Sequence, residues 1–246
     1  MATNRRRTPG ARGRIGIIQP APGVMLEHEW PRWLPPEVLF PVGRIRMPGA
    51  TSEAYAQMAA DAPEMARDLA FAGAGVIAYA CTIGSLFAGA GAESDLLARL
   101  SEAAGGRPAI GLAATCAEAL RAVGGSRLAI MTPYSSETNG WVADYANAQG
   151  FAVDSFLTTP VGIVEVGNIQ PPEIAAFAIA EMARRPDADA LWIPCTAIQT
   201  MDAIATIEAV TGRPVISGTQ ALMWHALRIL GVDDPIRGAG RLFDIR

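Results

Sequence analysis

The chain has no lysine, because all 20 of its basic residues are arginine. A pyridoxal-phosphate enzyme needs a lysine for its Schiff base, and a Walker-type phosphate loop needs its own lysine. Both classes of protein are therefore excluded. Histidine is almost as scarce, with only His28 and His225 among 246 residues. A metal site built from several histidines is therefore not expected.

Cysteine is also scarce, and its spacing is unsuited to structural roles. Cys81, Cys116 and Cys195 are far apart, odd in number and without a CxxC pair, so neither a disulfide framework nor a zinc site is expected. No apolar run approaches the roughly 18 residues of a membrane-spanning helix. No secretory signal is recognisable. We expect a cytoplasmic protein with no membrane contact.

Charge of either sign is sparse. Charged residues make up 18% of the chain and the net charge is −4, which argues against a nucleic-acid surface. Half of the residues are hydrophobic, enough for a substantial core, so a disordered or fibrous chain is excluded.

Short runs rich in Val and Ile alternate with Ala-rich helical stretches after a polar, Arg-rich segment, residues 1–13, which we expect to be a disordered tail. The alternation predicts parallel sheets covered by helices on both faces, an α/β fold. Strands are predicted at residues 14–18, 75–80, 109–112, 127–131, 190–193 and 214–216. Helices are predicted at residues 52–72, 95–104, 116–123, 136–149, 172–184, 201–211 and 220–230.

The two halves of the chain repeat one another. GRIGIIQP, VIAYACT and GRPAIGLAAT in the first half match SRLAIMTP, ALWIPCT and GRPVISGTQA in the second, with Cys81 and Cys195 114 residues apart. The repeat predicts two similar lobes related by a pseudo-twofold axis. Their approximate bounds are 14–115 and 116–246, with a possible exchange of one segment between lobes.

Cys81 and Cys195 each follow a predicted buried strand and precede a threonine. Ligands of parallel sheets bind beyond the carboxyl ends of the strands, so the two thiols are expected on opposite walls of one cleft. One thiolate could remove a proton or attack carbon while the other thiol delivers a proton to the opposite face, without a metal or organic cofactor. The alternative for any single cysteine is simple packing, which is our interpretation of Cys116.

A thiol with an ordinary pKa near ~8.5 needs help to ionise. The segments after Cys81 and Cys195 are predicted to begin helices, whose N-termini would lower the thiol pKa and bind a carboxylate. The loops at the ends of the first strand of each half should face the same cleft. Ser135 and Ser136 are expected to cap a helix. Thr82, Tyr134, Thr196 and the backbone of Pro20 and Ala21 are expected to hold a carboxylate. The full set of candidate substrate-binding residues is Pro20, Ala21, Gly23, Thr82, Ile83, Tyr134, Thr196 and Ala197.

Neither histidine is expected to be catalytic. His28 lies in LEHEW, which we interpret as a polar turn, and His225 falls in a core-like helical pattern.

These motifs resemble the aspartate/glutamate racemase superfamily, in particular the branch that contains maleate cis-trans isomerase and arylmalonate decarboxylase. The resemblance spans about residues 13–243 and rests on GIIQP, YACTIGS, MTPYSSETN, PCTA (which includes Ala197) and GRLFD. It implies a cofactor-independent enzyme of small acids, with Cys81 and Cys195 as a base and acid pair. In the isomerase, the thiolate matching Cys81 adds to the double bond and the thiol matching Cys195 protonates the next carbon. In the decarboxylase, glycine replaces the first cysteine and the second protonates an enediolate.

Three departures from the isomerase pattern remove polar groups. Gly23 occupies the place of a carboxylate-binding asparagine, a second asparagine is replaced around Ile163 with Asn168 nearby, and Ile83 stands where serine is common. The resemblance therefore implies a more apolar pocket, better suited to an acid with one apolar substituent than to a tightly held dicarboxylate.

The first hypothesis is an isomerase or racemase of a small carboxylic acid that uses both cysteines. The second is an arylmalonate decarboxylase-like lyase with Cys195 as the proton donor. The third is a non-catalytic acid-binding protein. A homo-oligomer is compatible with the sequence, and residues 30–40 are a candidate subunit contact or flap over the site.

Overall fold

The computed structural model describes residues 8–89, 91–159, 161 and 165–245. Its strands form two parallel sheets. In the first, the order is β2 (Val38–Leu39), β1 (Gly13–Pro20), β4 (Val76–Tyr79), β5 (Ala109–Gly111), and β3 (Val42–Ile45) also pairs with β1. In the second, the order is β7 (Ala152–Thr158), β6 (Arg127–Thr132), β8 (Ala190–Ile193), β9 (Val215–Ser217).

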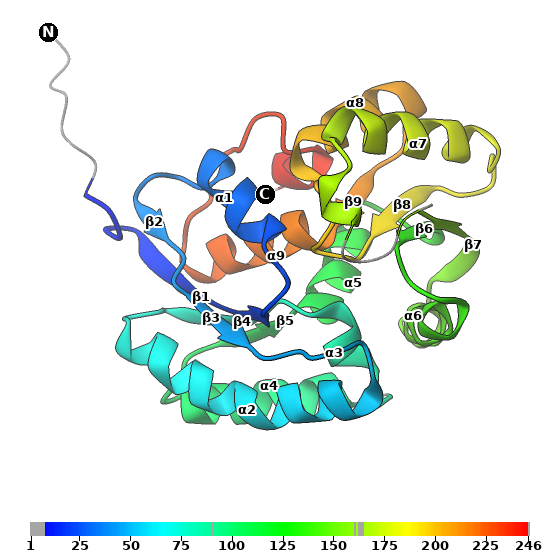
Figure 1. Cartoon of the computed structure of the whole chain (residues 1–246). Helices are drawn as coiled ribbons and strands as arrows, with labels where there is room; N and C mark the ends of the chain where they lie inside the picture. Colours follow the sequence, from blue (N-terminus) through cyan, green and yellow to red (C-terminus); the bar gives the residue numbers. More distant parts are fainter. Residues whose placement is uncertain (1–7, 90, 160, 162–164, 246) are drawn as a thin grey trace, which may run out of the picture.

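Helices cover both faces of the sheets. In Figure 1, α2 and α4 lie below the first sheet, α7 and α8 lie above the second, and α5 and α9 lie between the two. The helices are α1 (Met25–Trp33), α2 (Ser52–Phe71), α3 (Thr82–Leu86), α4 (Ala92–Ala103), α5 (Leu112–Ala122), α6 (Ser136–Ala148), α7 (Pro171–Ala183), α8 (Met201–Thr211) and α9 (Gly218–Ile229), with short 3-10 helices at Val166–Asn168 and Arg241–Asp244.

The two halves have one topology. Apart from β2 and α3, which have no counterpart in the second half, the order β1-α1-β3-α2-β4-α4-β5-α5 is repeated as β6-α6-β7-α7-β8-α8-β9-α9, and corresponding strands occupy corresponding places in the two sheets. The α/β class and the duplicated lobes are therefore confirmed. Helix α9 contacts β4 and β5 of the first sheet, while α5 contacts β9 of the second. The predicted lobe boundary after residue 115 falls inside α5.

Burial explains why the central strands are continuously apolar. Every residue of β4 (VIAY) and of β8 (ALWI) is buried, because helices pack on both faces of each sheet. Polar residues are consequently displaced to the strand ends, where the cysteine motifs begin.

Four expectations are corrected by the structure. LEHEW lies in the helix α1 rather than a turn, and it buries Leu26 and Trp30, which share a helix face. Strands β2 and β3 were missed, and β2 places part of the 30–40 segment in the first sheet rather than in a flap. Strand β7 was also missed, since only one of its residues is fully buried.

The N-terminal segment is the fourth correction. Residues 8–13 belong to the fold and not to a tail: the Arg12 N–H donates to the Glu37 carbonyl at 3.1 Å, and its guanidinium pairs with Asp234. The remainder of the predicted tail, residues 1–7, lies outside the described residues.

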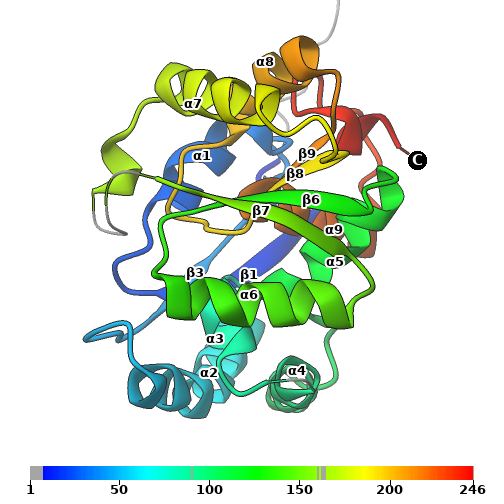
Figure 2. The ribbon, with the colours of Figure 1, turned by 90° about the vertical axis from the view of Figure 1, so that its right-hand side faces the viewer.

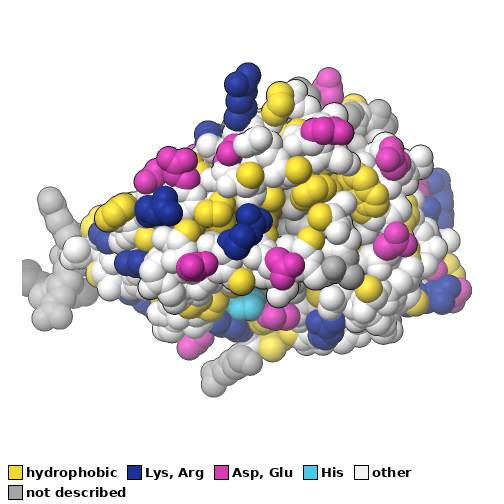
Figure 3. All heavy atoms as spheres, turned by 90° about the horizontal axis from the view of Figure 1, so that it is seen from below, with side chains coloured by type: hydrophobic (Ala, Val, Ile, Leu, Met, Phe, Trp, Pro, Cys, Tyr) yellow, Lys and Arg dark blue, Asp and Glu magenta, His cyan; other side chains and the backbone are white. Residues whose placement is uncertain are grey.

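No helix within the described ranges is long and apolar enough to cross a membrane. The face seen in Figure 3 carries acidic and basic side chains interspersed among apolar ones. Figure 2 shows α6 below β6 and β7 and above α3, and α6 contacts both α3 and β7. Helix α6 of the second half therefore contacts the first half at α3, the helix that begins after Cys81.

Candidate active site

Two central strands deliver the two cysteines to corresponding places. Cys81 follows β4 and Cys195 follows β8, each at the carboxyl end of its strand. Both cysteines are buried: Cys81 is 8% exposed and Cys195 is 4% exposed. Each thiol would be influenced by a charge on the other, since ionised Cys195 raises the pKa of Cys81. The structure thus places the two cysteines close enough for a charge on one to act on the other.

Cys81 occupies the N-cap of α3, as the sequence suggested. Its sulfur accepts a hydrogen bond from the Gly84 N–H at 3.3 Å and a second from the Ile83 N–H. A Cβ on Gly84 would lie 3.0 Å from this sulfur and 2.6 Å from the Tyr79 hydroxyl. Glycine at position 84 therefore allows the first turn of α3 to close around the thiol.

Cys195 is followed by a turn and not by the predicted helix. Residues 196–198 form turns or bends, and α8 begins only at Met201. The Ala197 and Ile198 N–H groups nevertheless bind the Cys195 sulfur. A tight turn can orient successive N–H groups toward an anion as a helix N-terminus does, so both thiols have two backbone donors.

Tyr134 joins the two cysteine motifs. It follows β6, and its hydroxyl lies within hydrogen-bonding reach of both the Cys195 sulfur and the Thr82 hydroxyl. The phenol stabilises a thiolate at Cys195, while burial and the nearby thiols raise the pKa of Tyr134 well above its usual range. Tyr134 is therefore a neutral donor at physiological pH.

Burial dominates the acidity of both thiols. It raises the pKa of Cys81 to about 12, although the Gly84 and Ile83 N–H groups act in the opposite direction. Burial also raises the pKa of Cys195, which Tyr134 and two N–H groups partly offset. Both cysteines are therefore thiols at neutral pH, and Cys195 has the larger number of donors that stabilise its anion.

Thr82 links the two lobes directly. Its hydroxyl donates to the carbonyl of Pro194, the residue before Cys195, at 2.6 Å, and its side chain is buried. Its hydroxyl hydrogen is thus committed to this bond. The next residue, Ile83, is also buried, whereas Thr196 and Ala197, which follow Cys195, are partly exposed.

The loop that follows β1 is held by hydrogen bonds to residues of β3. The Ala21 N–H donates to the Ile45 carbonyl at 2.7 Å, and the Gly23 N–H donates to Pro20 at 2.9 Å. Arg44 donates to the carbonyls of Ala21 and Gly23 at 2.7 and 2.9 Å. These N–H groups are therefore already paired, and the loop presents shape rather than free backbone donors.

The sequence also predicted that a second carboxylate-binding asparagine is replaced around Ile163, with Asn168 nearby, and the structure describes only part of this segment. Ile163 lies outside the described residues, and Asn168 ends the 3-10 helix Val166–Asn168.

Sequence reasoning missed two tyrosines. Tyr55 on α2 is nearly buried, and its pKa is raised to about 12 by burial and by the charges of both cysteines. Tyr79 on β4 is fully buried, its hydroxyl has no hydrogen-bond partner among the described residues, and a charge on Cys81 raises its pKa. With Tyr134, three of the four tyrosines lie close enough to a cysteine for its charge to raise their pKa, in addition to the larger effect of burial. The position of Tyr79, two residues before Cys81, was the one feature of the sequence that pointed to a tyrosine near the thiol.

The third cysteine and the two histidines lie apart from the two Cys-Thr motifs. Cys116 is fully buried within α5. His28 is exposed and 3.4 Å from Arg32, while His225 Nδ1 lies 2.9 Å from a carboxylate oxygen of Glu118 and connects α9 with α5. Among the described residues, no group of three or more His, Cys, Asp or Glu side chains is placed to hold a metal ion.

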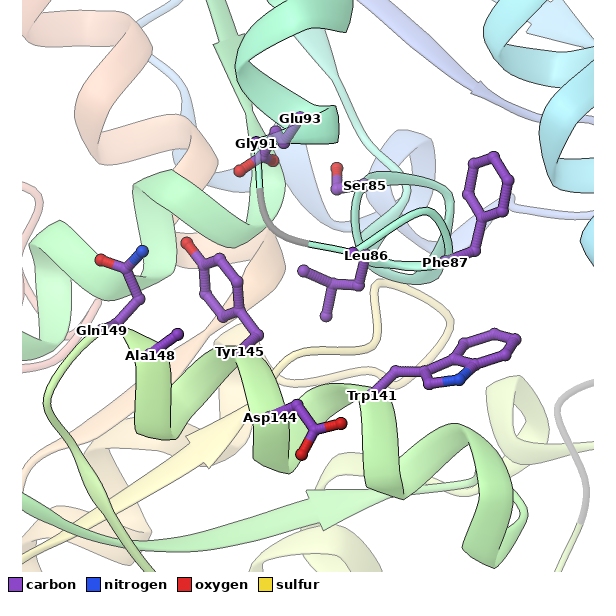
Figure 4. Close-up of a pocket in the computed structure, with 11 residues that line it drawn as sticks. Ser85, Leu86, Phe87, Gly91, Glu93, Trp141, Asp144, Tyr145, Ala148 and Gln149 are labelled. Carbon is purple, nitrogen blue, oxygen red and sulfur yellow. The ribbon is translucent and has the colours of Figure 1, made fainter.

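A cavity of about 370 Å³ opens behind the site between α3, the start of α4 and α6. Figure 4 shows the Tyr145 hydroxyl and the Ser85 side chain directed toward the Glu93 end of this cavity, with Trp141 and Phe87 at the other end. Glu93 accepts the N–H groups of Ala113 and Ala114 at 3.2 and 3.0 Å. Neither Cys81 nor Cys195 is among its lining residues.

Known proteins resemble this chain over nearly its whole length. A family profile described as arylmalonate decarboxylase matches residues 15–243. A maleate isomerase from Nocardia farcinica is 31% identical over 239 residues, 93% of this chain and 94% of that protein. An arylmalonate decarboxylase from Bordetella bronchiseptica is 27% identical over 232 residues, 94% of this chain and 96% of that protein.

A solved structure provides the third comparison. A cysteine-to-serine variant of the Nocardia farcinica maleate cis-trans isomerase, with a covalently bound succinylcysteine intermediate, has a TM-score of 0.84 at 28% identity and covers 94% of this chain and 97% of that one. The similarity thus includes both kinds of enzyme that the cysteine motifs indicated.

Proposed function

Because the chain belongs to the arylmalonate decarboxylase family, we propose that it is an enzyme of small carboxylic acids whose chemistry is performed by thiols. The more specific proposal is a cofactor-independent isomerase or racemase that uses Cys81 and Cys195. The observation that carries it is the pair of buried thiols at corresponding strand ends, each with two backbone donors. Full-length relatives include maleate isomerases and an arylmalonate decarboxylase.

Two facing thiols suit a reaction on both faces of one carbon. In racemisation, one thiolate removes the proton next to the carboxylate, and the electron pair is held in an enediolate. The second thiol returns a proton to the opposite face and becomes the thiolate. In one direction Cys81 is the base and Cys195 the acid, and the roles exchange in the other. The net charge of the pair is unchanged after each turnover.

Isomerisation of an unsaturated acid uses the same groups differently. The Cys81 thiolate forms a bond to one alkene carbon, the electron pair moves toward the carboxylate, and Cys195 protonates the neighbouring carbon. After rotation about the new single bond, Cys195 removes the proton and the Cys81–carbon bond breaks. The succinylcysteine intermediate of the Nocardia farcinica relative is support for such an adduct in this fold.

The proposed substrate-binding residues surround the two thiols. Tyr134, Thr196 and Ala197 on the second lobe face Thr82 and Ile83 on the first, and the Pro20, Ala21 and Gly23 loop shapes the entrance. Ile83 is buried and apolar, and Tyr55 adds an aromatic ring near both thiols. This composition favours an acid with one apolar or aromatic substituent.

A decarboxylase of substituted malonates is the second candidate, and a specific observation favours it. Burial keeps Cys195 protonated at neutral pH, as a proton donor to an enediolate must be. In that reaction the carbon–carboxyl bond breaks, carbon dioxide leaves with no electron pair, and Cys195 supplies the proton. Cys81 would only line the pocket.

Proton NMR in D₂O distinguishes these reactions. The purified, reduced protein is incubated with maleate, both enantiomers of aspartate, glutamate, a 2-arylpropionate and phenylmalonate. Conversion of maleate to fumarate, or deuterium entering an α-carbon, supports two-thiol chemistry. Deuterated phenylacetate supports the lyase. Ligand-induced thermal stabilisation without turnover of any acid contradicts both and favours the binding-protein hypothesis.

Three matched variants assign the thiols. We expect Cys81→Ala and Cys195→Ala to abolish isomerisation or racemisation, and Cys116→Ala to retain it, because Cys116 packs inside α5. Retained isomerisation in Cys81→Ala would contradict the two-thiol mechanism. Carbon dioxide release that survives Cys195→Ala would contradict the lyase mechanism.

A further inference from the structure

Glu29 is a fully buried carboxylate that joins the two halves of the molecule. It lies on α1 of the first half, and its side chain is 0% exposed. Its Oε1 accepts the N–H groups of Thr200 and Met201, at 2.6 and 2.7 Å, in the second half. These two residues begin α8, so a side chain from one half supports the start of a helix in the other.

Helix α8 has no side-chain cap of its own. The N-cap residue Thr200 makes no capping hydrogen bond, and its hydroxyl donates instead to the Ser217 hydroxyl at 2.9 Å. The first N–H groups of a helix need acceptors and carry the positive end of its dipole. The Glu29 carboxylate satisfies two of these N–H groups, which explains why a charge is buried here.

The segment held by Glu29 is the one that surrounds the Cys195 sulfur. Between Cys195 and Thr200, the Ala197 and Ile198 N–H groups bind the thiol. Before it, Thr82 fixes the Pro194 carbonyl at 2.6 Å, and after it, Gln199 donates to the Gly167 carbonyl at 2.7 Å. Glu29 fixes the far end of this loop. The direction of the two N–H groups toward sulfur therefore depends on the contact with Glu29.

The second carboxylate oxygen makes Glu29 sensitive to ionisation. Its Oε2 is buried and has no hydrogen-bond partner among the described residues, so a full charge there is poorly solvated. Burial accordingly raises the pKa of Glu29 to about 7, against the two N–H bonds.

The charged groups that act on Glu29 come from two helices. Asp202 on α8 raises the pKa of Glu29 and Arg32 on α1 lowers it. These two side chains pair with one another at 2.6 Å. On the α9 side, the Trp30 indole donates to the Thr219 carbonyl at 3.2 Å, and Thr219 carries no ionisable group.

We propose that Glu29 is a positioning residue whose ionisation sets how firmly the loop from Cys195 to Thr200 is held and thereby how reactive the Cys195 thiol is. A carboxylate accepts stronger hydrogen bonds from N–H groups than a neutral carboxyl does. Above neutrality, ionised Glu29 holds the loop so that the Ala197 and Ile198 N–H groups stabilise the Cys195 thiolate. Below neutrality that restraint weakens. The inference refines the proposed role of Cys195 and can be tested without a substrate.

The test is site-resolved alkylation with iodoacetamide, followed peptide by peptide by mass spectrometry from pH 6 to 8.5. The Glu29→Gln variant keeps an oxygen acceptor but never carries the charge. We expect wild type and Glu29→Gln to alkylate Cys195 at similar rates at pH 6, and wild type to react about fivefold faster at pH 8, the lower end of typical coupling between sites. Cys116, which is fully buried in α5, should stay unlabelled while the protein is folded and so reports any unfolding.

Two further variants make the outcome specific. Glu208→Gln removes another buried carboxylate, which accepts the N–H groups of Val215 and Arg241 and does not contact the loop, so its Cys195 profile should match wild type. Asp202→Asn leaves Glu29 in place and removes the negative charge that faces it, so the change in reactivity should move to lower pH. This variant alters a partly exposed side chain and tests the idea even if Glu29→Gln folds poorly.

The proposal is overturned if the ratio of the two Cys195 rates stays constant across this pH range, or if Glu208→Gln changes the profile as Glu29→Gln does. It is also overturned if the Asp202→Asn profile is unshifted. Because alkylation needs no substrate, these results are independent of whether the proposed isomerase or lyase activity is found.

Discussion

At the scale of single residues, the two thiols are unequal. Cys195 is bound by the Tyr134 hydroxyl and two N–H groups, whereas Cys81 is bound by two N–H groups. The first proton lost from the pair therefore comes mainly from Cys195. Such a pair titrates as a unit rather than as two independent cysteines. A reversible two-thiol reaction uses both charge arrangements, and the one with Cys195 ionised is the more populated.

The pH dependence of turnover follows from this residue-level picture. Because burial raises the thiol pKa values, to about 12 for Cys81, the thiolate fraction should grow about tenfold per pH unit between pH 7 and 9. We expect the isomerisation or racemisation rate to rise with the same slope in steady-state assays, with circular dichroism showing that the protein stays folded. A lyase that needs the Cys195 thiol would show a flat rate over this range, and a falling rate would contradict both mechanisms.

Tyr134→Phe tests the phenol at the same scale. Loss of a hydrogen bond to a charged group costs roughly 1.5–3 kcal/mol, so the pKa of Cys195 should rise by roughly one unit or more. The pH profile of Cys195 alkylation measures this shift. Tyr145→Phe is the control, since Tyr145 is influenced by Glu93 and Cys116 rather than by the two active-site thiols. Equal shifts in both variants would argue against a direct bond to Cys195.

At the scale of elements, the starts of two helices, α5 and α8, are supported by side chains from elsewhere in the chain. Glu93 of α4 binds the first N–H groups of α5, and Glu29 of α1 binds those of α8. Neither helix has a side-chain cap at its own N-cap residue, which is Gly111 for α5 and Thr200 for α8, so a distant carboxylate takes that place. Gly111, the residue before α5, is the tightest example, because a Cβ there would lie 2.1 Å from Glu93 Oε1.

Gly111→Ala should therefore destabilise the protein by about 1–3 kcal/mol, the usual cost of overpacking, and weaken the Glu93 cap. Gly140→Ala is the matched control. Gly140 is an exposed glycine inside α6 with open space around its Cα, so alanine there should be neutral or stabilising by about 0.5–1 kcal/mol. Urea unfolding of both variants measures the difference. A Gly111→Ala variant as stable as wild type would show that Glu93 moves aside freely.

At the scale of the whole molecule, the two halves are held together by contacts that lead to the site. Thr82 reaches the residue before Cys195, and Glu29 reaches the loop after it. Helices α5 and α9 pack against each other between the sheets and against strands of opposite halves. Any relative movement of the halves would consequently change the surroundings of both thiols together.

Ionisation of the buried Glu29 carboxyl lowers the free energy of unfolding by an amount that depends on pH. The pKa of Glu29 is about 7 in the fold and ordinarily 4.5, so the folded state binds more protons between these values. Its favourable contribution is present below pH 4.5 and is lost as pH rises through 7. The difference corresponds to about 3 kcal/mol. We expect Glu29→Gln to be more stable than wild type at pH 8, by up to this amount, and similar at pH 5.

Urea unfolding at the two pH values checks this expectation. Glu27→Gln on the same helix is the comparison, because Glu27 is partly exposed and paired with Arg44 and Gln19. A wild-type protein that is more stable than Glu29→Gln at pH 8 would contradict the burial cost inferred for Glu29.

Much of the architecture was readable from local pattern. Continuous apolar runs such as VIAY and ALWI predicted central strands because both of their faces are covered. The matched Cys-Thr motifs predicted the duplication and the two thiols at strand ends. Helix α1 was missed because Pro31 and neighbouring charges disguised its buried Leu26 and Trp30 face. Strand β7 was missed because it is mostly half-exposed.

The sequence by itself determined the fold class, the repeat and the two thiols, since these depend on periodicity and on residue types at matched positions. Tertiary structure alone decided which groups act on those thiols. Tyr55 and Glu29 come from segments far from either cysteine, and the turn after Cys195 replaces the predicted helix. The physical reason is that acidity and hydrogen bonding depend on distance and burial in space, which neighbouring letters in a chain do not encode.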